Sequence, residues 1–201
     1  MEASGLFDII QSRRSIRRYL DRPVPEAMLR RLLEAARWAP SAHNRQPWRF
    51  AVITDPARLA SLARAMGERL RADLLADGAP PDVIEREVGR SYVRISGAPA
   101  LMALFLSMAD MARYPDARRQ SLEHMMAAQS VAVAAQNILL MAHAEGLGAC
   151  WMCAPLFCPD VVRAALSLPA DWEAQALITV GFPAEQREKD REPLESKTRW
   201  Y

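Results

Sequence analysis

The residues best suited to chemistry lie in short segments near the two ends of this 201-residue chain. Residues 13–18 hold four arginines and one serine, and residues 197–199 read Lys-Thr-Arg. Guanidinium groups bind a phosphate monoester through paired, charge-assisted hydrogen bonds, and lysine adds a point charge. The two segments together predict a phosphate clamp, although residues 13–18 alone also fit a solvated basic face.

A turn-rich stretch lies between them, residues 39–48 (APSAHNRQPW), in which two prolines restrict the backbone. Ser41, Asn44 and Gln46 offer hydrogen-bond donors and acceptors without net charge. Such groups match the pyrimidine edge of a flavin ring, although the same residues are common in ordinary turns. A phosphate clamp combined with neutral amides suits bound flavin mononucleotide (FMN), and hence redox chemistry.

These segments need a scaffold, which the spacing of apolar residues predicts. Helices are expected at residues 4–14, 26–38, 56–76, 82–95 (with Asp82 as its cap), 120–145 and 159–168. Strands are expected at residues 48–54, 100–106, 149–152 and 175–182. Because helices separate the strands, we expect an α+β, three-layer fold with a mixed sheet covered by helices. No shift in composition marks a boundary, so residues 1–201 are expected to form one domain.

The helix predicted at residues 120–145 is apolar on nearly every side, with Gln129, Gln136 and Asn137 as exceptions. A helix with little polar surface is usually buried from both directions. In a chain of this length, that pattern predicts burial against a second subunit, and therefore a homodimer.

Composition excludes several classes of protein. Lysine and arginine total 26 against 24 acidic residues, so the net charge of +2 argues against a nucleic-acid binder. No apolar stretch reaches the ~20 residues of a membrane span, and no secretory signal is visible. Three cysteines do not make a disulfide framework, which favours the cytoplasm.

The order of these motifs resembles the nitroreductase family of flavoenzymes. That family combines an Arg-Arg/His-Ser-x-Arg/Lys segment with a Pro-Ser-x-x-Asn-x-Gln-Pro-Trp loop, and residues 13–17 and 40–48 match both. Residues 145–148 (EGLG) and 197–199 follow in family order. The resemblance runs from about residue 8 to the end of the chain. It implies a homodimer with two flavin sites at its interface.

The resemblance also implies a set of FMN-binding residues. Arg13, Arg14, Ser15 and Arg17 would contact the phosphate, the ribityl chain and the pyrimidine edge, with Lys197 and Arg199 completing the phosphate clamp. Pro40, Ser41 and Asn44 would come from the other subunit, and Gln46 would support their loop. Cys153 and Ala154, in the run 150–158, would place backbone N–H groups near flavin N5 and O4. This run is bulkier and richer in sulfur than the Pro-Ile-Gly-Gly run of many relatives.

The implied activity is FMN-dependent oxidation of NADH or NADPH, with ping-pong transfer to nitroaromatic, quinone or similar acceptors. The chemistry would take place at flavin N5, with no side chain as catalyst and no metal, and Arg17 would stabilise charge near N1 and O2. Within the family, alternatives are a reductase of a deazaflavin-cofactor precursor and a flavin-fragmenting enzyme of benzimidazole synthesis. Outside enzymes, the alternative is a flavin-binding protein without turnover.

The three cysteines leave two interpretations open. Cys150 and Cys153 form a Cys-x-x-Cys pair and Cys158 follows, which suits a redox pair. No fourth ligand with zinc spacing is nearby. Buried structural thiols are the plainer interpretation, since cysteine is among the most readily buried residues.

Overall fold

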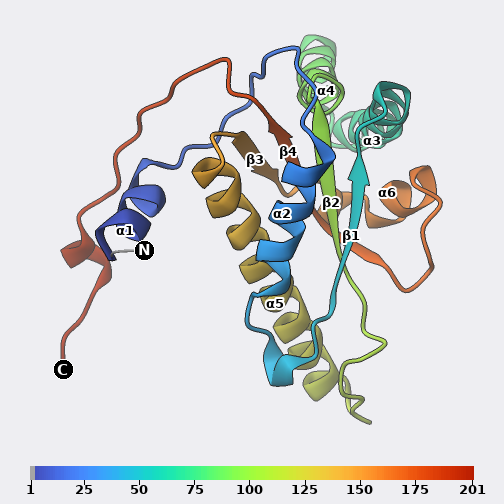
Figure 1. The fold of residues 1–201 in the computed structure, drawn as a ribbon. Helices are drawn as coiled ribbons and strands as arrows, with labels where there is room; N and C mark the ends of the chain where they lie inside the picture. Colours follow the sequence, from blue (N-terminus) through green and yellow to red (C-terminus); the bar gives the residue numbers. More distant parts are fainter. Residues whose placement is uncertain (1–2) are drawn as a thin grey trace.

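The computed structural model describes residues 3–201 (Figure 1). Its α-helices are α1 (Ala3–Ser12), α2 (Glu26–Arg37), α3 (Pro56–Ala76), α4 (Pro81–Ser96), α5 (Ala117–Ala144) and α6 (Pro159–Ala165). Its strands are β1 (Trp48–Ile53), β2 (Ala100–Leu106), β3 (Gly148–Met152) and β4 (Glu173–Gly181). Short 3₁₀ helices are η1 (Ala42–Asn44), η2 (Ala154–Phe157) and η3 (Leu194–Lys197). The predicted helices and strands are all present, within a few residues at their ends.

The four strands form one sheet in the order β1-β2-β4-β3, and every neighbouring pair is antiparallel. The expected α+β class is confirmed, but the prediction of a mixed sheet is wrong for the named strands. The only parallel pairing in the described chain is an isolated bridge between Ser15 and Ala149. Strands β2 and β3 run in the same direction, but β4 lies between them and is antiparallel to both, an insertion that the sequence pattern does not reveal.

The sheet is the middle of three layers, as Figure 1 shows. Every residue of β2 is buried, and its side chains alternate between the two faces. Met102 and Leu104 belong to the core formed with α2 and α5. Leu101 and Phe105 belong to the core formed with α3, α4 and α6. The continuous apolar run of β2 follows from this burial on both faces.

Two helix starts show how local sequence sets the boundaries. Asp55 caps α3 by accepting a hydrogen bond from the Ala57 N–H (2.9 Å). The prediction that Asp82 caps α4 is wrong, because the helix already begins at Pro81 and Asp82 lies in its first turn. Proline suits this first position, since it lacks an N–H that would have no helical partner.

Helix α5 has 28 residues and is therefore about 42 Å long. Its length and composition would suffice for a membrane span, but one side packs on α2 and on the sheet. The other side exposes large apolar residues at Leu122, Met125 and Val133. Helix α5 is thus a core helix of this fold with an apolar stripe that no described element covers.

Candidate functional site

The arginine segment runs beside the edge of the sheet at β3. The Ile16 N–H donates to the Ala149 carbonyl (3.0 Å), and the Tyr19 hydroxyl donates to the Ile16 carbonyl (2.6 Å). Gly148 permits this close approach, because a Cβ there would lie 2.7 Å from the Ile16 side chain. The backbone of the segment is therefore fixed, and its arginine side chains are presented from a rigid edge.

Four of the predicted phosphate and ribityl contacts meet in one cavity of about 450 Å³. Its lining residues are Arg13, Arg14, Ser15, Arg17, Arg187, Glu188, Lys189 and Arg191. The last four belong to residues 184–192, which we call the C-terminal arm. We call this space the basic cavity. The sequence predicted the N-terminal half of its lining and missed the arm.

The C-terminal arm is tied to the arginine segment at its base. The Ala184 N–H donates to the Arg18 carbonyl (3.0 Å), and the Arg17 N–H donates to the Glu185 carboxylate (2.7 Å). Arg187 pairs with the same carboxylate at 3.0 Å. These donors lower the pKa of Glu185, with the Arg187 hydrogen bond as the largest cause. A charged Glu185 therefore holds the arm over the arginines.

The cations of the basic cavity are crowded and short of anions. Within residues 3–201, no carboxylate lies within 4.0 Å of Arg13, Arg14, Arg17, Lys189 or Arg191 in an ion pair. Burial, followed by the charges of Arg191 and Arg14, lowers the pKa of Arg13. The Nε of Arg14 is buried without a hydrogen-bond partner. Buried donors need acceptors, so the cavity is suited to an anion of more than one charge.

Lys197 and Arg199 do not line the basic cavity. Lys197 lies at the end of η3 and its Nζ pairs with Glu192 at 2.5 Å. Their role in the phosphate clamp stays a prediction. The cationic residues that line the cavity from the C-terminal part of the chain belong instead to the arm. They are Arg187, Lys189 and Arg191, which occupy every second position of the sequence.

A second cavity of about 330 Å³ adjoins the first and shares Arg17. It is lined at the end of β3 by Cys150, Cys153 and Ala154, and across from them by α4, including Arg94. Ala154 begins η2, and N–H groups at the start of a helix have no partner within it. The structure thus brings Arg17, Cys153 and Ala154 together. Sequence reasoning missed Arg94, whose position on a charged helix surface carried no distinguishing signal.

The three thiols differ in their surroundings. Cys150 and Cys158 are buried and Cys153 is exposed. Burial raises the pKa of both buried thiols, which suppresses the thiolate that reacts. Cys150 and Cys158 are therefore buried structural thiols. Cys153 instead faces the second cavity. All three thiols are free.

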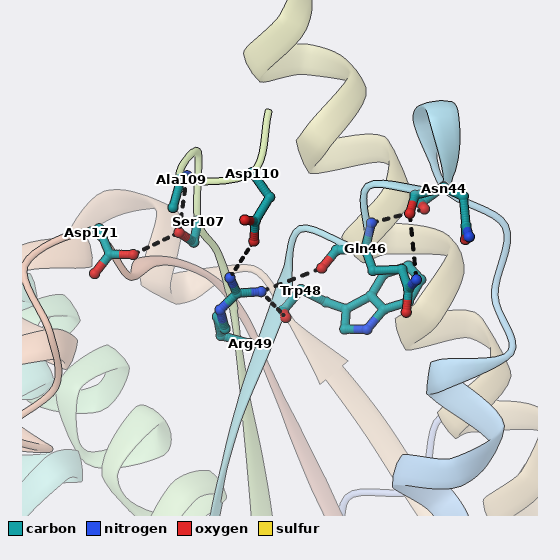
Figure 2. Close-up of polar contacts among 9 residues, drawn as sticks. Asn44, Gln46, Trp48, Arg49, Ser107, Ala109, Asp110 and Asp171 are labelled. Carbon is teal, nitrogen blue, oxygen red and sulfur yellow. Dashed lines mark hydrogen bonds and ion pairs between the residues drawn. The ribbon is translucent and has the colours of Figure 1, made fainter. Parts of the chain in front are cut away.

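The remaining predicted residues form a strained loop, residues 40–47, which we call the ring-edge loop. His43, Asn44 and Gln46 all have positive φ, at 50°, 54° and 51°, a conformation that asparagine tolerates but that costs energy at His43 and Gln46. Ser41 stabilises it by accepting from the Gln46 N–H (3.0 Å). Arg49 donates to the carbonyls of Gln46 and Trp48 and to Asp110, as Figure 2 shows.

Figure 1 shows the ring-edge loop, which includes η1, at one end of α5, and the arginine segment that follows α1 toward the other end. The loop contacts α5 at Ser130, whose Oγ accepts from the Ala42 N–H (3.3 Å). Near the arginine segment, α5 is contacted at His143, whose Nε2 lies 2.8 Å from Ser12 Oγ. Thirteen residues of helix separate these contacts, or about 20 Å. The predicted residues Pro40, Ser41, Asn44 and Gln46 therefore do not reach the arginines of their own chain.

Comparison with known proteins identifies the family to which this architecture belongs. The model of the nitroreductase family matches residues 10–182, and the chain belongs to this family. A Thermus thermophilus protein named NADH dehydrogenase is 38% identical over 200 residues, covering 94% of this chain and 92% of that protein. A 5,6-dimethylbenzimidazole synthase from Rhodospirillum rubrum is 32% identical, covering 90% and 83%.

A solved structure supports the same assignment. A nitroreductase-like protein from Desulfovibrio desulfuricans, crystallised in complex with FMN, is 31% identical and superposes with a TM-score of 0.76. The match covers 98% of this chain and 96% of that one. The chain is thus an oxidoreductase of the nitroreductase family, as the sequence motifs indicated.

Proposed function

We propose that the chain is an FMN-dependent NAD(P)H oxidoreductase of the cytoplasm, formed by one domain and active as a homodimer with flavin at the interface. The basic cavity is the observation that carries this proposal. Arg187 pairs with Glu185, but Arg13, Arg14, Arg17 and Arg191 have no ion pair within residues 3–201, and Arg14 has a buried donor without an acceptor. The phosphate of FMN, which carries nearly two charges, matches that donor set.

The cavities suggest how this chain holds FMN. Arg13, Arg14 and Ser15 bind the phosphate end, together with cations of the C-terminal arm. Arg17 lines both cavities and would supply positive charge to the pyrimidine edge of the ring. The N–H groups of Cys153 and Ala154 would donate to the N5 and O4 edge. FMN held there would supply the hydride chemistry for oxidation of NADH or NADPH and reduction of a nitroaromatic, quinone or similar acceptor.

The separation of the ring-edge loop from the basic cavity supports the dimer. Two copies that pack their α5 helices in opposite directions bring the loop of one beside the basic cavity of the other. The exposed stripe of Leu122, Met125 and Val133 supplies an apolar surface for this contact. Pro40, Ser41 and Asn44 then serve the flavin of the partner, with Gln46 supporting the loop.

The direct test is to compare FMN with riboflavin on purified protein, and then to mix the FMN-loaded protein anaerobically with NADH or NADPH. We expect a yellow dimer that binds FMN at least tenfold more tightly than riboflavin, since charged hydrogen bonds contribute about 1.5–3 kcal/mol each. We also expect flavin bleaching and parallel double-reciprocal plots, as ping-pong kinetics require. Failure to take up FMN would refute the proposal. Uptake without bleaching would favour a flavin-binding protein without turnover.

A second candidate is favoured by the 32% identity to a 5,6-dimethylbenzimidazole synthase. In that case the enzyme would consume its own reduced flavin in air and form the benzimidazole. Chromatography of the flavin after aerobic reduction separates the two functions. Intact FMN after many turnovers supports the reductase, and loss of one FMN per site supports the synthase.

A further inference from the structure

A cavity of about 280 Å³ lies between α3, α4 and η2. We call it the α3–η2 cavity. It belongs to the layer of helices that packs on the sheet face opposite α2 and α5, where α3 and α4 lie side by side (Figure 1). None of the residues that line the basic cavity lines it, so this space is separate from the proposed phosphate site.

The α3–η2 cavity adjoins the second cavity, which the flavin ring is proposed to enter. Leu70, Ser91 and Ala154 line both spaces, and the N–H of Ala154 is proposed above to donate to the N5 and O4 edge of the flavin. The two spaces have volumes of about 280 and 330 Å³, and together they fall within the range of small-molecule sites. A molecule that lies beside the flavin can therefore extend past Ala154 into the α3–η2 cavity.

One side of the α3–η2 cavity is an apolar stripe along α3. Met66, Leu70 and Leu74 line it, and residues four positions apart are neighbours on one face of a helix. Eight residues of helix span about 12 Å. The lining is therefore long and apolar, which suits an extended hydrocarbon chain better than a compact polar group.

The opposite side is also apolar. Cys158 lines it and is buried, and its Sγ donates to the Ala154 carbonyl (3.7 Å). Burial raises the pKa of this thiol, so it stays uncharged and behaves as a small apolar group. Phe157 lines the same side and is 75% exposed, so most of its ring is free to pack against a ligand.

The charged residues at the rim are already satisfied. Arg69 pairs with Asp73 at 2.9 Å and lies 4.0 Å from Asp160, and the hydrogen bond with Asp73 is the largest cause of the raised pKa of Arg69. Asp77 is exposed to solvent at the end of α3. Among the described residues that line this cavity, no charge therefore calls for a counter-ion, and burial of apolar surface is the force left for binding.

We propose that the α3–η2 cavity holds the apolar chain, alkyl or prenyl, of a molecule whose polar ring is reduced beside the flavin. The chain packs between the α3 stripe and Phe157 and passes Ala154 to reach the ring. The cavity thereby makes the enzyme selective for acceptors that carry a chain over acceptors with the same ring and no chain. This selectivity rests on the function proposed above, whereas binding of the chain does not.

Phenols with a para alkyl chain of one to four carbons test the binding without turnover, titrated calorimetrically onto the purified protein with and without FMN. We expect the affinity to rise about threefold for each added methylene, because each one is removed from water. Across the series this gives 4-butylphenol an advantage of about 30-fold over 4-methylphenol.

Two substitutions in the lining should reduce this advantage at least fivefold each. Leu74→Gln places a polar group in the α3 stripe, and Phe157→Ala removes the opposite wall. Leu75→Gln and Leu156→Ala are the matched controls, since both residues are exposed neighbours that do not line the cavity. The controls should keep the advantage of the longer chain.

An affinity independent of chain length, or an advantage unchanged in the Leu74→Gln, Phe157→Ala double variant, overturns the chain site. A circular-dichroism melt confirms that the variants are folded. The selectivity is tested by the ratio of kcat/KM values for 2-butyl- and 2-methyl-1,4-benzoquinone. A ratio of at least fivefold that is lost in the double variant supports it, and equal values in the wild type overturn it. Failure to bind FMN would refute the proposed function, while the phenol series would still decide the chain site.

Discussion

Replacing Arg49 with alanine should open the ring-edge loop and weaken FMN binding. Arg49 donates to the carbonyls of Gln46 (3.3 Å) and Trp48 (3.0 Å) and to the carboxylate of Asp110 (2.9 Å). The two carbonyl contacts contribute about 1 kcal/mol each. The ion pair adds less than about 1 kcal/mol, because the Asp110 side chain is 60% exposed.

The strain of the loop opposes these contacts. His43 and Gln46 hold positive φ without the tolerance of glycine or asparagine, and such conformations cost of order 1 kcal/mol each or more. A loss of about 2 kcal/mol of support is therefore comparable to the stored strain, and the loop should spend most of its time relaxed. The apparent affinity falls with the fraction of competent protein, so we expect FMN to bind about thirtyfold more weakly.

Equilibrium dialysis of FMN against wild-type and variant protein measures this change. Asp110→Asn is the matched control: it removes only the ion pair, and its FMN affinity should fall less than threefold. Arg49→Lys keeps the charge but not the fork of donors, and it should be intermediate. FMN affinity in Arg49→Ala within twofold of wild type, with the fold intact by circular dichroism, would show that Arg49 does not maintain the loop.

Three further experiments test other parts of the site. Met125→Glu places a charge on the exposed stripe of α5 and should give a colourless monomer by light scattering, whereas a yellow dimer would show that this stripe is not the interface. Arg191→Gln should lower the preference for FMN over riboflavin about tenfold in equilibrium dialysis. Arg199→Gln, measured in the same way, shows whether the extreme C-terminus contributes to phosphate binding as the sequence predicts. Iodoacetamide should label Cys153 alone at neutral pH, with FMN slowing the reaction, and equal labelling of all three thiols would contradict the burial of the others.

Acidification should release the C-terminal arm. The pKa of Glu185 lies below its usual value in the folded protein. The stabilisation that its charged carboxylate gives to the arm is therefore fully present above the pKa of Glu185 in the unfolded chain. It is lost as the pH falls through the lower pKa of the folded protein. Proteolysis after Arg187, with a protease active in acid, should therefore accelerate in that range. Glu185→Gln should show fast cleavage already at neutral pH. A cleavage rate independent of both pH and this substitution would mean that the carboxylate does not tether the arm.

The sequence was most informative where one local rule decides the structure. The run of β2 is apolar at every position, and the structure places it at the centre of the sheet with both faces covered. The 56–76 helix has an aspartate cap and a proline at its first position, and its bounds match those of α3. The arginine segment was recognised from residue types alone, and Arg13, Arg14, Ser15 and Arg17 do meet in one cavity.

Features that depend on distant contacts were not visible in the sequence. Antiparallel pairing throughout the sheet depends on how the helical connections cross it. The arm residues Lys189 and Arg191 look like any charged, irregular stretch, and only their tether to Arg17 through Glu185 brings them to the arginines. The strain at His43 and Gln46 was also hidden, because neither residue type signals positive φ as glycine would.

The division of the proposed site between two chains has a thermodynamic consequence. Ser12, which precedes the arginine segment, and the ring-edge loop contact α5 about 20 Å apart, so a single protomer would offer FMN only part of the proposed contacts. A ligand that binds the dimer more tightly than the monomer must favour dimerisation by the same free energy. FMN affinity should therefore rise with protein concentration, and FMN should lower the concentration at which dimers form. At saturation, riboflavin should do so to a similar extent, because it makes the ring-edge contacts that only the dimer offers, whereas the contacts between the arginines and the phosphate are the same in monomer and dimer.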